Sequence, residues 1–194
     1  MQGRLIVIEG IDGAGTTTQT RLLVDWMNAS GRPAHATREP SDGPVGRLLR
    51  EILAGGHAPV AGATMALLFA ADRMDHLSRE IEPALARGQH VVSDRYYHSS
   101  LAYQAEEADR DFVAAINARA RKPDLTVLLR VDAQRAAERR HAAGRTTERY
   151  DDLALQERIA QNYDRIGGMT IIDGEKSVES VQEALRREVE KVCA

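Results

Sequence analysis

The chain has 194 residues and a formal net charge of −3, with 43% hydrophobic and 28% charged residues. These values are ordinary for a soluble globular protein, and the slight acidity argues against a dedicated nucleic-acid binder. The single cysteine, Cys193, excludes an intrachain disulfide and is typical of a reducing compartment. The first apolar run, residues 5–8, is too short for a signal peptide or a membrane span. We therefore expect a cytoplasmic protein that binds neither nucleic acid nor membrane.

Short apolar runs alternate along the chain with longer segments of helical periodicity. The runs that predict buried strands are residues 5–8, 90–93, 125–129 and 169–172, with 33–37 as a weaker candidate. Apolar residues recur at helical spacing from Val178 to Val192 and predict a last helix. This alternation predicts an α/β fold in one domain spanning residues 1–194, a parallel sheet with helices on both faces.

A glycine-rich turn follows the first predicted strand and leads into a helix, which is the context of a phosphate-binding loop. Its glycines can turn successive N–H groups toward one point, where the helix N-terminus adds its dipole. Compared with the pattern G-x-x-x-x-G-K-[ST], Gly10, Gly15 and Thr17 match, but Thr16 stands at the lysine position. We expect the loop to bind a nucleotide phosphate through Gly10, Asp12, Gly13, Ala14, Gly15, Thr16, Thr17 and Thr18.

Further short motifs follow in order along the chain. They are TREP at 37–40, LFAADR at 68–73, DRY at 94–96, SSLAYQ at 99–104 and KPDL at 122–125. Together with EGIDG at 9–13, this ordered set resembles the bacterial thymidylate kinases over most of the chain. The resemblance implies a P-loop nucleoside monophosphate kinase fold with a five-stranded sheet and a short lid. It also implies a homodimer that transfers the γ-phosphoryl group of ATP to thymidine monophosphate (dTMP) with Mg²⁺.

Arginines at two strand ends are the first candidates for binding the acceptor. Arg38 and Arg95 each follow a predicted strand, where a guanidinium can offer forked donors to a phosphate. An exposed arginine is usually only a solvated surface charge, but the position of these two within motifs favours a binding role. Asp94 and Thr17 lie where related P-loop proteins hold Mg²⁺.

The resemblance also assigns the nucleoside contacts. Phe69 would stack on the thymine ring, and Arg73 would bind its carbonyl edge. An aromatic residue in an apolar helix is more often part of the core, so Phe69 depends on its motif. The remaining substrate contacts implied by the resemblance are Asp12 at the sugar 3′-hydroxyl, Tyr103 near the sugar, Ser100 and Gln104 near the base, and Ser99.

A basic segment at residues 135–150 matches the lid of the family. Such a run is usually a solvated helix face, but bacterial thymidylate kinases carry catalytic arginines there. Because Thr16 leaves a charge gap, and none of the three lysines is expected beside the loop, the hypothesis is that a lid arginine fills it. The candidates are Arg139, Arg145 and Arg149, with Arg149 favoured because ERYD at 148–151 resembles the end of the family's lid.

Two alternatives stay open at the level of the sequence. Thr16 is compatible with a weak or inactive relative that binds a nucleotide without turnover. A kinase for another pyrimidine nucleotide or for a deoxynucleoside is the second alternative. Turnover assays with different acceptors distinguish all three.

Overall fold

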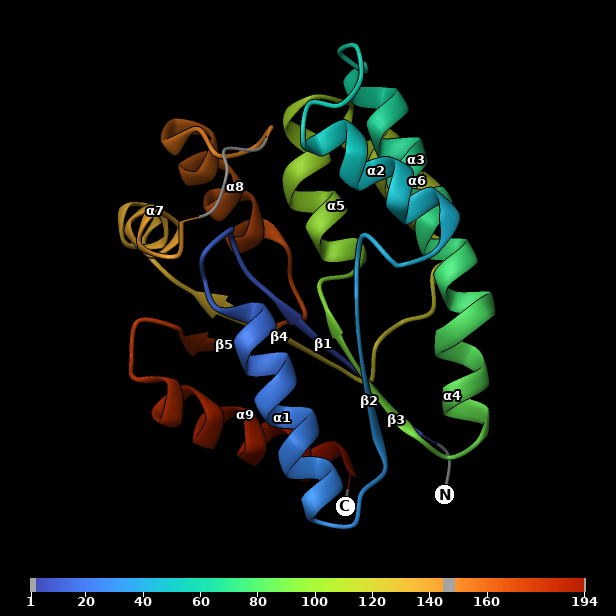
Figure 1. Ribbon diagram of the computed structural model, residues 1–194, viewed down its shortest axis with the longest axis vertical. Helices are drawn as coiled ribbons and strands as arrows, with labels where there is room; N and C mark the ends of the chain where they lie inside the picture. Colours follow the sequence, from blue (N-terminus) through green and yellow to red (C-terminus); the bar gives the residue numbers. More distant parts are fainter. Residues whose placement is uncertain (1–2, 145–148, 194) are drawn as a thin grey trace.

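The sheet of the computed structural model, which describes residues 3–144 and 149–193, consists of five parallel strands in the order β2-β3-β1-β4-β5 (Figure 1). The strands are β1 (Leu5–Glu9), β2 (Ala34–Arg38), β3 (His90–Asp94), β4 (Leu125–Arg130) and β5 (Thr170–Asp173). Every predicted strand is present, including the weaker one. The predicted parallel sheet is therefore confirmed, and no strand end differs from its prediction by more than one residue.

Helices connect consecutive strands and cover both faces of the sheet. They are α1 (Thr16–Ala29), α2 (Pro44–Leu53), α3 (Gly62–His76), α4 (Glu82–Ala86), α5 (Tyr97–Tyr103), α6 (Arg110–Asn117), α7 (Ala133–Ala142), α8 (Leu153–Arg165) and α9 (Val178–Cys193). A π-helical segment, η1 (Leu77–Ile81), joins α3 to α4, and a short 3₁₀ segment, η2 (Gln104–Glu106), follows α5. The predicted last helix corresponds to α9.

Alternation along β1 divides the core between the two faces of the sheet. Ile6 and Ile8 are fully buried in the cluster that contains residues of α1 and α9, whereas Leu5 and Val7 are fully buried with residues of η1 and α4. Successive side chains of a strand point to opposite faces, so an unbroken apolar run is what a doubly covered strand requires. Figure 1 shows α1 and α9 together on one side of the sheet and α4 on the other.

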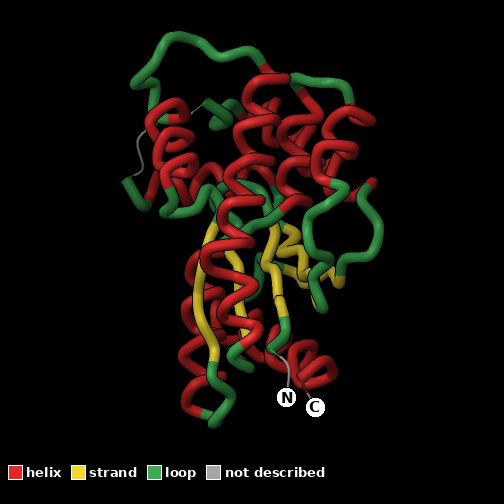
Figure 2. Tube along the Cα trace, turned by 90° about the vertical axis from the view of Figure 1, so that its right-hand side faces the viewer, coloured by secondary structure: helices red, strands yellow, loops and turns green. Residues whose placement is uncertain are grey.

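The carboxyl ends of the parallel strands meet at one edge of the sheet, and that edge is where ligands bind in open α/β folds. Figure 2 shows most of the remaining helices gathered beyond one end of the strands, with both termini near the opposite end. Within residues 3–144 and 149–193, no helix combines the length and the apolarity needed to cross a membrane.

Candidate active site

A cavity of about 880 Å³ opens at the carboxyl ends of the strands and contains most of the residues singled out from the sequence. The predicted residues that line it are Asp12, Gly13, Ala14, Gly15, Thr16, Thr17, Thr18, Arg38, Phe69, Arg73, Asp94, Arg95, Ser99, Tyr103, Gln104 and Arg139. Segments far apart in the sequence therefore converge on one space, as the topology predicts.

Three of the predicted residues that the structure describes are not part of this lining. Gly10 packs behind the loop, where an added Cβ would lie 2.8 Å from the Ala14 Cβ. Ser100 is buried and accepts a hydrogen bond from Arg73 Nη2 at 3.2 Å. Arg149 instead donates to Glu107 Oε2 at 2.9 Å and to the Val60 carbonyl at 3.0 Å, and Arg145 lies outside the described residues.

The phosphate-binding loop depends on two glycines with left-handed backbone angles, Gly13 at φ 91° and Gly15 at φ 96°. Gly15 immediately precedes α1, and its conformation turns the chain into the first helical turn. Gly13 lies against α7, where a Cβ would come within 2.3 Å of the Ala136 carbonyl oxygen. The backbone N–H groups at the start of α1 therefore face the cavity as an anion-binding cradle.

We expect Gly13→Ala to destabilise the protein by about 1–3 kcal/mol, because it combines a disfavoured φ with overpacking against α7. Gly31→Ala is the matched control: its φ is also positive, at 73°, but a Cβ there meets no atom within 4 Å. Denaturant unfolding of both variants measures the steric part of the effect as the difference between them. Equal losses of stability would show that contact with α7 does not constrain the loop.

Thr17 and Asp94 form the part of the site that fits a magnesium ion. Thr17 Oγ1 donates to Asp94 Oδ2 at 2.5 Å, and Asp94 Oδ1 is buried with no hydrogen-bond partner among the described residues. Hydroxyl and carboxylate oxygens are ligands that Mg²⁺ prefers, and it completes its shell with water and phosphate oxygens. No group of three or more His, Cys, Asp or Glu side chains in the described part of the chain could hold a metal by itself.

Arg95 is held at the centre of the cavity by a strained backbone and a carboxylate. Its φ of 71° is unusual for a residue other than glycine, and such strain concentrates at functional sites. Its Nη2 donates to Asp12 Oδ1 at 2.8 Å, and its Nη1 donates to Ser99 Oγ at 3.2 Å. The guanidinium also lies over the Tyr103 ring, 5.0 Å from the centroid. Its orientation is therefore fixed before any ligand binds.

Near Arg95 lies Glu9, a fully buried carboxyl that belongs to the EGIDG motif but was given no role from the sequence. It accepts hydrogen bonds from Tyr96 N at 2.9 Å, Ser99 Oγ at 2.6 Å and Tyr163 Oη at 2.8 Å. Burial raises the pKa of Glu9 to about 7, although these hydrogen bonds and the charge of Arg95 oppose the rise. Glu9 thus links β1 to the start of α5 below the cavity.

Two cations that the sequence did not single out also line the cavity. Arg140 of α7 is buried, and it donates through Nη1 to the Asp12 carbonyl at 2.5 Å while its Nε lies 3.2 Å from Asp151 Oδ1. Lys176 follows β5 and lines the same cavity as the loop. One lysine therefore lines the site, although the sequence analysis considered none of the three as a candidate. The position of Lys176 just after β5 was the signal that could have identified it as a residue of the site.

Phe69 and Arg38 lie on the side of the cavity away from α7. Phe69 is half-buried and belongs to neither apolar core cluster, so its ring is available to a ligand. Arg38 is largely exposed and donates to Asp42 Oδ1 at 2.9 Å. A flat ring and a guanidinium on one wall suit a ligand that has both an aromatic and an anionic part.

Comparisons with known proteins agree with this geometry. The sequence profile of the family described as "Thymidylate kinase" matches residues 8–185. The chain is 38% identical over 192 residues to the "Probable thymidylate kinase" of Pyrococcus abyssi, a match that covers 94% of each chain. It is 40% identical over 189 residues to that of Thermococcus onnurineus (91% of this chain, 92% of the relative) and 45% identical over 161 residues to that of Methanococcus maripaludis (82% and 75%). This protein belongs to the thymidylate kinase family.

Proposed function

We propose that this chain transfers the γ-phosphoryl group of ATP to dTMP and forms thymidine diphosphate. The observation that carries the proposal is the single cavity in which a phosphate-binding loop meets Arg38, Phe69 and Arg95. Phosphoryl transfer depends mainly on positioning the two phosphates and on neutralising the charge of the moving group. The attacking oxygen belongs to an ionised phosphate, so no general base is needed.

On the acceptor side, Arg38 and Arg95 bind the phosphate of dTMP through paired N–H donors. Phe69 stacks on the thymine ring, and Arg73 faces its carbonyl edge, while Ser100 acts behind Arg73 as a hydrogen-bond partner. The other substrate contacts in this proposal are Asp12 and Tyr103 at the sugar, with Ser99 and Gln104 beside them.

On the donor side, the loop amides of residues 13–18 bind the phosphates of ATP. Thr17 and Asp94 would hold Mg²⁺, which would supply positive charge to neutralise the phosphates. Arg139 lines the same cavity as Thr16 and is our leading candidate for the cation that replaces the missing lysine. Arg149 would reach the donor through closure of a lid at residues 135–150, as in the lid-arginine type of the family, because it is bound to Glu107 and Val60. Arg145, which lies outside the described residues, is the third candidate.

Two broader properties belong to the same proposal. The chain forms one kinase domain over residues 1–194 and acts in the cytoplasm, in keeping with its single cysteine. It works as a homodimer, and support comes from the exposed apolar side chains of Leu67 and Met74 on α3, which are 49% and 45% exposed. Sedimentation analysis tests the oligomeric state.

A coupled assay of ADP release with ATP and Mg²⁺ tests the proposed function. We expect turnover with dTMP, and weaker turnover with uridine and cytidine monophosphates offered alone or in competition. Selective turnover of another acceptor would transfer the assignment to that nucleotide. Binding of ATP and dTMP without any release of ADP would identify a nucleotide-binding relative without kinase activity.

A further inference from the structure

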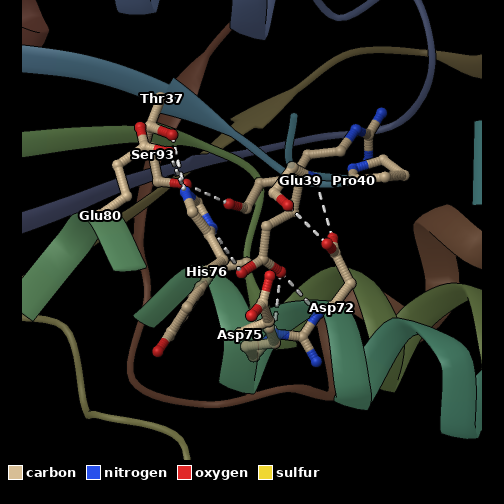
Figure 3. Close-up of polar contacts among 12 residues, drawn as sticks. Thr37, Glu39, Pro40, Asp72, Asp75, His76, Glu80 and Ser93 are labelled. Carbon is tan, nitrogen blue, oxygen red and sulfur yellow. Dashed lines mark hydrogen bonds and ion pairs between the residues drawn. The ribbon is translucent and has the colours of Figure 1, made fainter. Parts of the chain in front are cut away.

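A buried ionic cluster lies at the edge of the cavity, between β2 and α3, and includes residues to which the proposed function gives no role. At its centre is Glu39, which is 6% exposed and contacts the imidazole of His76 (Figure 3). Glu39 Oε2 is 2.8 Å from both Nε and Nη2 of Arg73, and Oε1 is 3.3 Å from Nδ1 of His76. A carboxylate without access to water is stable only when its charge is compensated in this way.

His76 has an acidic partner on each side of its ring. Besides the Nδ1 contact to Glu39, its Nε2 is 2.7 Å from Thr37 Oγ1 and 3.6 Å from Glu80 Oε2. The π-helical turn of η1 carries Glu80, and such turns are frequent at functional sites. An imidazole with a carboxylate on either side serves both as a donor only when both nitrogens are protonated.

The electrostatics of the cluster agree with a charged ring. Burial disfavours the charge of His76, but hydrogen bonds to Glu39 and Glu80 raise its pKa to about 9. The contact with His76 in turn lowers the pKa of Glu80 to about 2. The other ionisable groups around the cluster are Arg73 beyond Glu39, Asp72 bonded to Ser41, and His35, which contacts Glu80 Oε1 at 2.7 Å.

Glu39 and Arg73 both line the cavity, and Arg73 is the member that the proposed function places at the nucleobase. It is 1% exposed, and all three of its nitrogens have protein acceptors: Nε and Nη2 contact Glu39, Nη2 also contacts Ser100, and Nη1 contacts Asn117. The guanidinium also lies 5.5 Å from the centroid of the Tyr96 ring. Its direction is therefore set by Glu39 together with Asn117 and Ser100, and Glu39 is the one charged partner among these three.

We propose that His76 is a positioning residue for nucleobase recognition: its imidazolium fixes Glu39, and Glu39 fixes Arg73 toward the cavity. The same ring forms a hydrogen bond with Thr37, the neighbour of Arg38. His76 therefore restrains the phosphate side of the acceptor site through Thr37 and the nucleobase side through Glu39. A single cation on Glu39 would already pair its charge, whereas a second cation fixes the geometry of the carboxylate. This inference rests on the proposed binding of dTMP beside Arg73.

His76→Gln tests the proposal, because glutamine keeps a hydrogen-bonding side chain but removes the charge. We expect the KM for dTMP to rise about tenfold, with kcat and the KM for ATP changed by less than about threefold. In the same variant, selectivity for dTMP over cytidine monophosphate should decrease, because Arg73 loses its fixed direction. His35→Gln is the matched control, since His35 contacts Glu80 but not Glu39, and it should leave the KM for dTMP unchanged.

A second measurement uses the unmodified protein and does not depend on folding of the variant. NMR titration of the His76 ring should show an imidazolium that persists at pH 7 and loses its proton near pH 9. A ring that is neutral at pH 7, an unchanged KM for dTMP in His76→Gln, or equal rises in the KM of both substrates would overturn the proposal. Failure of the unmodified protein to turn over dTMP would instead contradict the proposed function.

Discussion

Arg95→Ala should lower kcat/KM for dTMP by about a thousandfold while leaving the KM for ATP nearly unchanged. The guanidinium is a preorganised donor: its side chain is 16% exposed, and Asp12 Oδ1 holds it at 2.8 Å. Removing it leaves both the acceptor phosphate and the Asp12 carboxylate without their cation. Steady-state kinetics with each substrate varied in turn measures the effect.

Two further variants separate the sources of this loss. Arg95→Lys retains the charge but not the fork, and we expect it to recover no more than about a tenth of the activity. Arg130→Ala is the control for loss of an arginine at a strand end, because Arg130 forms an exposed pair with Asp164 and should retain full activity. Arg95→Ala with nearly normal kcat/KM would place the acceptor phosphate elsewhere.

Arg139→Ala should lower kcat about a hundredfold, and Thr16→Lys should restore most of that loss in the double variant. Arg139 lines the cavity with Thr16, and its Nη1 donates to the Gly174 carbonyl at 3.0 Å. If this arginine supplies the charge that a loop lysine usually supplies, then either cation is sufficient and the two changes are not additive. Single-turnover rates of the four proteins complete the cycle.

Arg149→Ala is the matched control in the same segment, because Glu107 and the Val60 carbonyl already occupy its guanidinium. We expect a small change in kcat from it. A large loss from Arg149→Ala with none from Arg139→Ala would show that lid closure brings Arg149 to the donor. Additive effects of Arg139→Ala and Thr16→Lys would mean that the two positions do not serve the same phosphate, and Arg140 or Lys176 would then be the next candidates.

The sequence predicted the sheet because its signal is local. Residues 5–8 are apolar without interruption, and β1 is covered on both faces by packed helices. The phosphate-binding loop at 10–18 could also be predicted, since its glycines and threonines occupy fixed positions between a strand and a helix. Ser100 illustrates the limit: its motif places it near the ligand, but helical geometry directs its hydroxyl to Arg73 behind the cavity wall.

The remaining differences arise from contacts between distant segments. Arg140 contacts the loop residue Asp12 from 128 residues away, and Lys176, after β5, lines the same cavity, so no spacing rule connects either of them to Thr16. His76 reads in the sequence as an ordinary member of α3. Its role depends on Glu39, which is 37 residues away in the chain and becomes its neighbour only when β2 packs against α3.

The buried Glu9 has a thermodynamic consequence for the whole protein. Its pKa is about 7 in the folded state and near 4.5 when the chain is exposed to water. Between these two values the folded protein binds a proton that the unfolded chain releases, so folding is accompanied by proton uptake. The contribution of Glu9 to stability is therefore largest below pH 4.5 and declines as the pH rises to about 7. At neutral pH, this carboxyl opposes the folded state that its hydrogen bonds organise.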